Sequence, residues 1–322
     1  MTIAEQIIVG RRLGRDDALD FLLETPLDEL MQGANAIRTA LCGNHIDLCT
    51  IINARSGKCS ENCKFCAQSA HHKTDIETYG FLSEDVVLAD SKRLEEKGVH
   101  RYSLVTAGRG LEGEDLAQAV SIYERLNNET GLYLCASHGL LSQEAFYALR
   151  DAGVRCYHCN IETSEEYFPH VCTTHTFQEK LENIQRAKRA GMEICSGGII
   201  GMGEGWSDRI SMALTTAQYG VSSIPINVLI PIPNTPAENE PPISVEDILR
   251  TVALFRYLNP TAFVRIAAGR YKFADGGAEL FLAGANATIT GDMLTTTGTN
   301  IAQDKEMLTN LGFDITPQGV LA

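Results

Sequence analysis

The sequence predicts an α/β fold, a (β/α)8 barrel of the TIM type with an N-terminal helical cap. One unit repeats along the 322 residues: an amphipathic helical run ends in glycine, and a short apolar segment typical of a buried strand follows at once. Helices that alternate with buried strands make a parallel sheet, because each crossover returns the chain in the same direction. Eight such strands fit a single barrel in a chain of this length, and they disfavour the alternative of a doubly wound open sheet.

The expected elements follow in order along the chain. Thr2 and Glu5 form a capping box that begins a helix, apolar residues continue at helical spacing through Leu23, and a second helical pattern follows Pro26. The expected strands are 46–53, 102–105, 132–135, 154–157, 192–195, 224–227, 263–266 and 286–289, and the last helix spans 304–312. We therefore expect a helical cap over residues 1–45, a barrel with a C-terminal helix over 46–315, and a loose tail over 316–322.

The composition narrows the classes of function. A net charge of −14 argues against general nucleic-acid binding, which needs a basic surface. The N-terminus lacks the pattern of a secretory signal, and no run approaches the ~20 apolar residues that span a bilayer. We expect a cytoplasmic protein that acts on small molecules, with neither nucleic acid nor membrane as a partner. Ten cysteines in such a chain indicate metal binding or catalysis rather than disulfides.

One loop carries the strongest chemical signal. Cys59, Cys63 and Cys66 are spaced C-x-x-x-C-x-x-C after the first expected strand, with Phe65 beside the last cysteine. Three thiolates from one loop can hold three irons of a cubane 4Fe–4S cluster and leave the fourth iron free to bind a small molecule. Zinc is the alternative, but a structural zinc site usually takes four protein ligands. The loop resembles the signature of the radical S-adenosylmethionine superfamily, whose open iron binds the amino and carboxylate groups of that cofactor.

Side-chain alternation predicts which residues of the fourth strand point into the barrel. The polar residues share one parity and are expected to face inward, with the cysteine deepest: Cys156, His158, Asn160 and Glu162. Together with Cys135 on the third strand and Cys195 on the fifth, Cys156 gives three neighbouring strands one thiol each. This pattern predicts a second metal–sulfur site below the first.

The other thiols have weaker signals. Cys159 has the opposite parity on the fourth strand and would face inward only if that strand were irregular. A buried free cysteine usually behaves as a small hydrophobic residue. We interpret Cys42, Cys49 and Cys172 in this way, because no other thiol accompanies them in the pattern.

Several longer segments resemble the biotin synthase family over residues 46–312. They are the cysteine loop with Gln68 and the segments 157–160, 195–204, 221–227, 264–270 and 281–286. The resemblance implies an enzyme that inserts sulfur between two unactivated carbons of dethiobiotin. It also implies a 5′-deoxyadenosyl radical made from S-adenosylmethionine at the first cluster, and sulfur drawn from a second, auxiliary iron–sulfur cluster deeper in the barrel.

The same resemblance assigns roles by position. Cofactor contacts fall on Phe65, Asn160, Glu162, Gly201 and Glu204, and substrate contacts on His158, Asn160 and Asn227. The family also implies an external electron donor such as flavodoxin or ferredoxin, and a homodimer.

The sequence departs from the family pattern at the auxiliary cluster. The usual cluster there is a 2Fe–2S held by three cysteines and an arginine. Cys135, Cys195 and Arg265 match three of these positions, but the fourth is Ser103, whose hydroxyl is a poor ligand for iron. Cys156 and Cys159 stand where the family generally has tyrosine and histidine. We predict a cluster rebuilt around Cys135, Cys156 and Cys195, of a 4Fe type rather than 2Fe–2S, with Arg265 as a ligand or neighbour.

Two other functions compete with this interpretation. The nearer one is another radical S-adenosylmethionine enzyme, of the hydrogenase maturation or methylornithine synthase type. The other is a non-enzymatic iron–sulfur carrier. Another radical S-adenosylmethionine enzyme would not be expected to need thiols on strands three to five, so the inner cysteines argue against it. An iron–sulfur carrier needs no iron with an open position.

Overall fold

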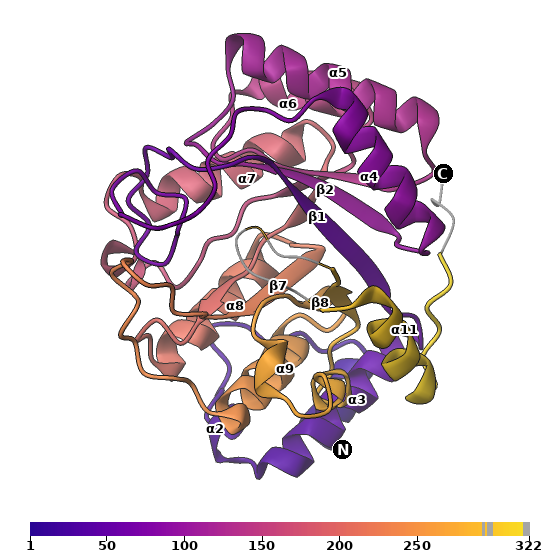
Figure 1. Cartoon of the computed structure of the whole chain (residues 1–322). Coiled ribbons are helices and arrows are strands. Elements are labelled where there is room, and N and C mark those ends of the chain that lie inside the picture. Colours follow the sequence, from indigo (N-terminus) through magenta and orange to yellow (C-terminus); the bar gives the residue numbers. More distant parts are fainter. Residues whose placement is uncertain (292–293, 295–298, 318–322) are drawn as a thin grey trace.

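The strands form a closed parallel barrel. A computed structural model describes residues 1–291, 294 and 299–317, and its strands run in the order β5-β4-β3-β2-β1-β9-β8-β7-β6. β5 (Glu193–Cys195) and β6 (Gly198–Ile200) both pair with β7 (Ser223–Val228), so they are two parts of one barrel strand and close the sheet. The predicted eight-stranded barrel is confirmed (Figure 1).

The remaining strands agree with the expected positions to within a few residues. They are β1 (Asp47–Arg55), β2 (Arg101–Thr106), β3 (Tyr133–Ser137), β4 (Cys156–His158), β8 (Phe263–Ile266) and β9 (Ala287–Ile289). The break between β5 and β6 was not predicted. At this break the backbones lie so close that a Cβ on Gly197 would lie 2.1 Å from the Pro225 carbonyl oxygen of β7.

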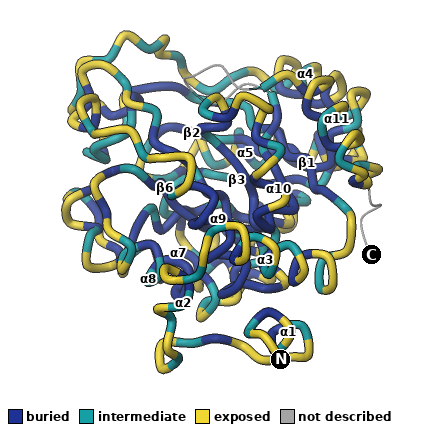
Figure 2. Tube along the Cα trace, turned by 90° about the horizontal axis from the view of Figure 1, so that it is seen from below, coloured by how far each residue is buried: buried dark blue, intermediate teal, exposed yellow. Residues whose placement is uncertain are grey.

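Helices surround the barrel, and the chain at the centre is buried (Figures 1 and 2). Their apolar faces pack inward while their polar faces stay in solvent. The longer helices are α4 (Glu84–Glu96), α5 (Gly113–Glu129), α6 (Gln143–Asp151), α7 (Phe177–Arg189), α8 (Trp206–Gln218) and α9 (Val245–Leu258). The shorter elements are η1 (Phe168–His170), η2 (Arg270–Lys272), α10 (Ala278–Leu282) and α11 (Ile301–Asn310).

The N-terminal segment contains α1 (Ile3–Ile8), α2 (Phe21–Glu24) and α3 (Leu27–Cys42). The capping box is confirmed, since Glu5 N donates to Thr2 Oγ1 at 3.2 Å and Thr2 N donates to Glu5 Oε2 at 2.7 Å. The expected continuation of this helix through Leu23 is wrong. α1 ends at Ile8, and Gly10 follows with a φ of +114°, which ends the helix because few other residues adopt it. α3 packs against α9 on the outside of the barrel.

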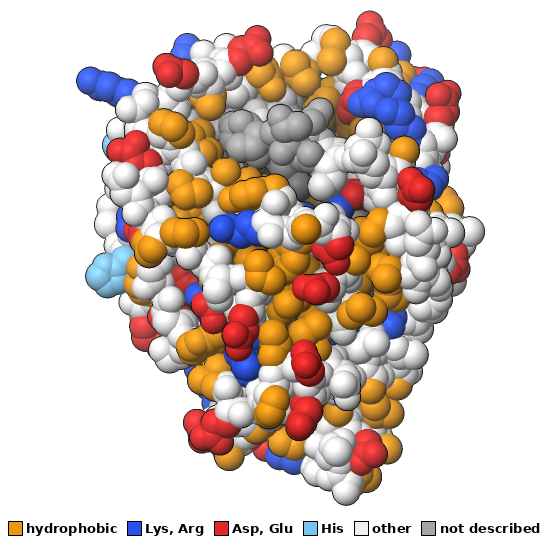
Figure 3. All heavy atoms as spheres, turned by 60° about the horizontal axis from the view of Figure 1, so that its bottom comes forward, with side chains coloured by type: hydrophobic (Ala, Val, Ile, Leu, Met, Phe, Trp, Pro, Cys, Tyr) orange, Lys and Arg blue, Asp and Glu red, His pale blue; other side chains and the backbone are white. Residues whose placement is uncertain are grey.

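The surface carries mixed charge. On the face drawn in Figure 3, acidic and basic side chains are interspersed among hydrophobic ones. Within the described residues, no helix has both the length and the apolar character to cross a membrane. The division into cap, barrel and tail stays a prediction, and residues 318–322 of the expected tail lie outside the described residues.

Candidate active site

A cavity of about 340 Å³ lies inside the barrel. Thiols and polar side chains line it, among them Cys49, Ser103, Cys135, Cys156, His158, Asn160, Glu162, Cys195, Asn227 and Arg265, with Phe65 from the cysteine loop. The inward parity predicted for the fourth strand is confirmed, because its four polar residues all line the cavity. Cys159 faces the opposite way and packs in the hydrophobic core, so its thiol is not part of the cavity wall.

The three predicted inner thiols lie on adjacent strands. Cys135 stands opposite Cys156 in the β3–β4 register, and Cys195 stands opposite His158 in the β4–β5 register. His158 Nδ1 lies 3.4 Å from Cys195 Sγ. A hydrogen bond with Cys135 raises the pKa of Cys156 most, and burial raises it as well. Burial also raises the pKa of Cys195. The raised pKa values favour the protonated form of Cys156 and Cys195, and a metal that binds them displaces these protons.

A fourth thiol lies in the same cavity. The interpretation of Cys49 as an isolated thiol is wrong, because its side chain lines the cavity from β1. Burial raises its pKa, Arg265 lowers it, and the nearby thiols of Cys135 and Cys195 raise it further. The alternation rule that was applied to the fourth strand would have found Cys49 if applied to the first.

Buried charges form the floor of the cavity. Asp47 accepts from Arg265 Nη2 at 2.6 Å and from Arg101 Nε at 2.9 Å, and all three side chains are buried. Burial alone would raise the pKa of Asp47, but the two guanidinium groups outweigh it and hold that pKa well below its usual range. Arg265 also donates to Ser223 Oγ at 3.2 Å and to the Thr288 carbonyl at 3.1 Å. Arg101 Nη1 also lies 3.7 Å from the carboxylate of Glu193, which is half exposed, so two cations and two anions meet beside the thiols.

Asparagine side chains are fixed at the upper part of the cavity. Asn160 Oδ1 accepts from Gly197 N at 3.1 Å, and its Nδ2 donates to Glu162 Oε2 at 3.3 Å. Asn227 Nδ2 donates to the Gly198 carbonyl at 3.1 Å. Glu162 has a φ of +70°, an unfavourable conformation that non-glycine residues keep mainly at functional sites.

Glu204 does not line the cavity. Its carboxylate accepts from Gly201 N at 2.9 Å and from Met202 N at 2.7 Å. Arg209 Nε donates to the same carboxylate at 2.8 Å. Glu204 therefore holds the turn after β6 in place, and the predicted contact of Gly201 and Glu204 with a cofactor stays a prediction.

The cysteine loop leaves the C-terminal end of β1, as predicted. Cys59 N donates to the Gln68 carbonyl at 2.9 Å, which closes the loop on itself. Burial and the nearby Cys59 outweigh the hydrogen bonds from the backbone of Gln68 and Ser69 and raise the pKa of Cys66 to about 11. The Cys63 thiol instead lies against Cys172, a contact that raises the pKa of Cys63 and lowers that of Cys172.

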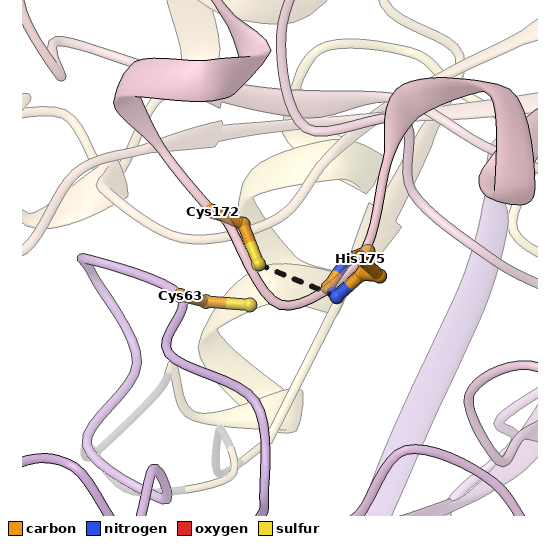
Figure 4. Close-up of side chains that lie close together, drawn as sticks. All are labelled: Cys63, Cys172 and His175. Atoms are coloured by element: carbon orange, nitrogen blue, oxygen red, sulfur yellow. Dashed lines mark hydrogen bonds between the residues drawn. The ribbon is translucent and has the colours of Figure 1, made fainter.

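The interpretation of Cys172 as an isolated thiol is therefore wrong. The ligand atoms of Cys63, Cys172 and His175 all lie within 4.8 Å of one another (Figure 4). The spacing C-x-x-H of Cys172 and His175 is common among metal ligands and could have drawn attention to them.

Comparison with known proteins places these features in a family. Residues 54–215 match the Radical SAM superfamily model, and residues 225–314 match the Biotin and Thiamin Synthesis associated domain. The chain is 60% identical to a biotin synthase from Clostridium beijerinckii, over 97% of this chain and 99% of that protein. It is 56% identical to a biotin synthase from Alkaliphilus metalliredigens, over 97% of this chain and 98% of that protein.

Solved structures confirm the fold at lower identity. Methylornithine synthase superposes with a TM-score of 0.83 at 20% identity, covering 98% of this chain and 97% of that one. The FeFe-hydrogenase maturase from Carboxydothermus hydrogenoformans gives 0.77 at 20% identity, covering 96% and 78%. At 20% identity these likenesses show the fold alone, whereas the biotin synthases match in sequence over nearly the full length of the chain. The chain belongs to the biotin synthase family of radical S-adenosylmethionine enzymes.

Proposed function

We propose that this chain inserts sulfur into dethiobiotin to form biotin, with a radical source at the rim of the barrel and a sulfur source at its floor. One observation carries the proposal. Thiols from adjacent strands share a single cavity with Phe65 of the cysteine loop and with the polar residues Asn160 and Asn227. A substrate in this cavity would lie between the two groups of thiols.

The rim would hold the first cluster and S-adenosylmethionine. Cys59, Cys63 and Cys66 are three thiols from one short loop, which is the donor set that a 4Fe–4S cluster with one open iron requires. When bound, the cluster would supply the electron that breaks a carbon–sulfur bond of S-adenosylmethionine, which gives methionine and a 5′-deoxyadenosyl radical able to take hydrogen from an unactivated carbon. Phe65 and Glu162 would bind the cofactor from the cavity wall, where the barrel restricts access of water.

The floor would hold the auxiliary cluster through Cys135, Cys156 and Cys195. Ser103 stands opposite Cys135 in the β2–β3 register, where its hydroxyl adds no good ligand for iron. Arg265 donates to Asp47, Ser223 and Thr288, so we assign it as a charged neighbour rather than a ligand.

Three thiolates with an exchangeable fourth position suit a cubane-type cluster that carries an extra sulfide for donation. Cys49 offers a further thiol in the same cavity. The guanidinium groups of Arg101 and Arg265 line the cavity and would stabilise both the thiolates and an anionic cluster. We therefore favour a 4Fe-type auxiliary cluster over 2Fe–2S.

The substrate would be oriented by His158, Asn160 and Asn227. These side chains line the cavity above the inner thiols. The amide of Asn227 is held on both sides, because Nδ2 donates to the Gly198 carbonyl and Oδ1 accepts from Ala268 N at 3.4 Å. A fixed amide of this kind can pair with the N–H and C=O groups of a ureido ring.

Turnover tests the reaction. The protein is incubated anaerobically with dethiobiotin, S-adenosylmethionine and dithionite, and biotin and 5′-deoxyadenosine are measured by mass spectrometry. Formation of both products is expected. Cleavage of S-adenosylmethionine without biotin would point to another substrate, and an absence of cleavage would leave only an iron–sulfur carrier.

Mössbauer spectra test the auxiliary cluster, with a matched pair of variants on one strand. Cys156→Ala is expected to remove the auxiliary signal and its share of bound iron and sulfide. Cys159→Ala changes a neighbouring thiol that faces the core, and it is expected to leave the spectrum unchanged. A normal 2Fe–2S signal that survives Cys156→Ala would contradict the proposed ligand set.

Two partner assignments extend the proposal. Flavodoxin or ferredoxin is the proposed electron donor, to be tested by replacing dithionite with each reduced protein in the turnover assay. A homodimer is the proposed assembly, to be tested by analytical ultracentrifugation of the anaerobic enzyme.

A further inference from the structure

A second group of metal-binding side chains lies outside the barrel cavity. Cys63 comes from the loop after β1, and Cys172 and His175 come from the segment between η1 and α7. Figure 4 shows the two thiols pointing toward each other, with the imidazole beside Cys172. Cys172 Sγ lies 3.3 Å from His175 Nδ1. None of these three residues is among the described residues that line the cavity.

Glu61 holds the imidazole of this group in place. Its Oε2 lies 2.5 Å from His175 Nδ1, and its carboxylate is 9% exposed. Arg109 Nη1 pairs with this carboxylate at 3.1 Å. Arg109 Nη2 also pairs with Glu179 at 2.6 Å, so Arg109 is shared by two carboxylates. The two thiolates by themselves would balance the charge of a divalent ion.

The group does not fit a nucleophilic triad. In a Cys-His-Glu triad, one imidazole nitrogen contacts the thiol and the other contacts the carboxylate. Here Nδ1 faces both Cys172 and Glu61, and Nε2 is buried without a hydrogen-bond partner among the described residues. Ligation explains the convergence better, because tetrahedral bonds of 2.0–2.3 Å to sulfur and nitrogen separate the ligand atoms by roughly 3.3–3.8 Å.

We propose that Cys63, Cys172 and His175 bind one divalent transition-metal ion, with Zn²⁺ the best match, when the chain lacks its 4Fe–4S cluster. The three residues supply two sulfurs and one nitrogen, and water would take the fourth tetrahedral position. Cys63 also belongs to the ligands proposed for the 4Fe–4S cluster, and one thiolate cannot occupy both positions. Occupancy by the single ion and occupancy by the cluster therefore exclude each other.

Titration with Co²⁺ tests the site in the full-length, cluster-free protein under anaerobic conditions. Tetrahedral Co²⁺ with thiolate ligands absorbs through sulfur-to-metal charge transfer. Any Co²⁺ bound by the inner thiols of the barrel adds the same absorbance in every variant, so differences between variants report on the proposed site. Cys172→Ala is expected to remove about half of the charge-transfer absorbance of this site, since one of two thiolates is lost. His175→Gln is expected to keep the charge-transfer bands but to shift the d–d bands.

Cys66→Ala is the matched control, because it changes a thiol of the same loop that lies outside the proposed site. It is expected to leave the Co²⁺ difference spectrum unchanged. If Cys66→Ala removes as much absorbance as Cys172→Ala, the three loop cysteines bind the ion and the proposal is wrong. An unchanged spectrum in Cys172→Ala would overturn it equally.

Cluster reconstitution gives a second measurement that needs no turnover. Equimolar Zn²⁺ added before iron and sulfide is expected to lower 4Fe–4S formation in the wild-type chain, as followed by iron and sulfide content. In Cys172→Ala the same Zn²⁺ is expected to have a smaller effect, because a ligand is missing. Equal inhibition of both proteins would show that Zn²⁺ acts elsewhere. These readouts are independent of whether dethiobiotin is the substrate.

Discussion

Replacing Asp47 by asparagine tests the charged floor of the barrel. The carboxylate lies between two guanidinium groups, and the exposed fractions of the side chains are 8% for Asp47, 9% for Arg101 and 3% for Arg265. Removing one partner of a buried ion pair costs about 3–5 kcal/mol, because an uncompensated charge stays buried. Arg101 keeps Glu193 at 3.7 Å and the Tyr133 ring at 4.1 Å, so its charge remains partly compensated. Arg265 has no other ion-pair partner among the described residues, so we expect the cost of one broken pair rather than two.

Urea unfolding of the cluster-free protein, followed by circular dichroism, measures this loss of free energy. Asp85→Asn is the control, because Asp85 pairs with Arg125 at 2.6 Å while remaining 85% exposed, and such pairs contribute about 0–1 kcal/mol. The lowered pKa of Asp47 means that its stabilisation is complete above its unfolded pKa of about 3.9 and is lost only as the pH falls toward its folded pKa. The difference between Asp47→Asn and wild type is therefore expected to be constant from pH 5 to pH 8. A loss no larger than that of Asp85→Asn would refute the reasoning.

Three further changes test other parts of the barrel. Burial lowers the pKa of His138 to about 3, so the fold holds it neutral and loses stability, by up to about 1.4 kcal/mol per pH unit, as the pH falls below about 6.5. Urea unfolding at pH 7 and pH 5 measures this decrease in the free energy of unfolding. The decrease is expected to be smaller in His138→Gln than in wild type, and to equal that of wild type in His170→Gln, because His170 is exposed. Gly197→Ala is expected to cost about 1–3 kcal/mol in the same assay, because its Cβ would meet a backbone oxygen at 2.1 Å, whereas Gly14→Ala has free space and should cost little. Cys49→Ala is expected to lower the iron and sulfide content of the reconstituted auxiliary cluster, and unchanged content would remove Cys49 from its ligands.

The barrel could be predicted from the sequence because its signals are local. Each glycine at a helix end and each short apolar run reports on a few neighbouring residues, and their regular repetition indicates the fold. The break between β5 and β6 has another origin. Gly197 lies against the carbonyl of Pro225, a contact between barrel strands that no local pattern contains. The early end of α1 was a different error, because apolar spacing was weighed above Gly10.

The site was predicted where strand alternation was applied and missed where it was not. Cys156 and Cys159 were assigned to opposite faces by parity alone, and the structure agrees. Cys49 obeys the same rule on the first strand, where the alternate residues Cys49 and Ile51 line the cavity. Cys172 could not be found by alternation, because it lies in an irregular segment whose contact with the cysteine loop depends on the tertiary fold.

One strand and its extension set the distance between the two proposed reaction centres. Cys156, His158, Asn160 and Glu162 follow one another at steps of two residues and all line the cavity. At about 3.3 Å per residue, the six steps from Cys156 to Glu162 span at most roughly 20 Å. The positive φ of Glu162 and its bridge to Gly198 bend the upper end of this segment, so the actual separation is shorter. An extended small molecule fits in that interval, with polar side chains beside it and thiols below. The backbone that carries Cys156, a proposed cluster ligand, thus also carries Asn160 and Glu162, which are proposed to meet the cofactor. In this proposal one element of the barrel sets the separation between the sulfur source and the radical source.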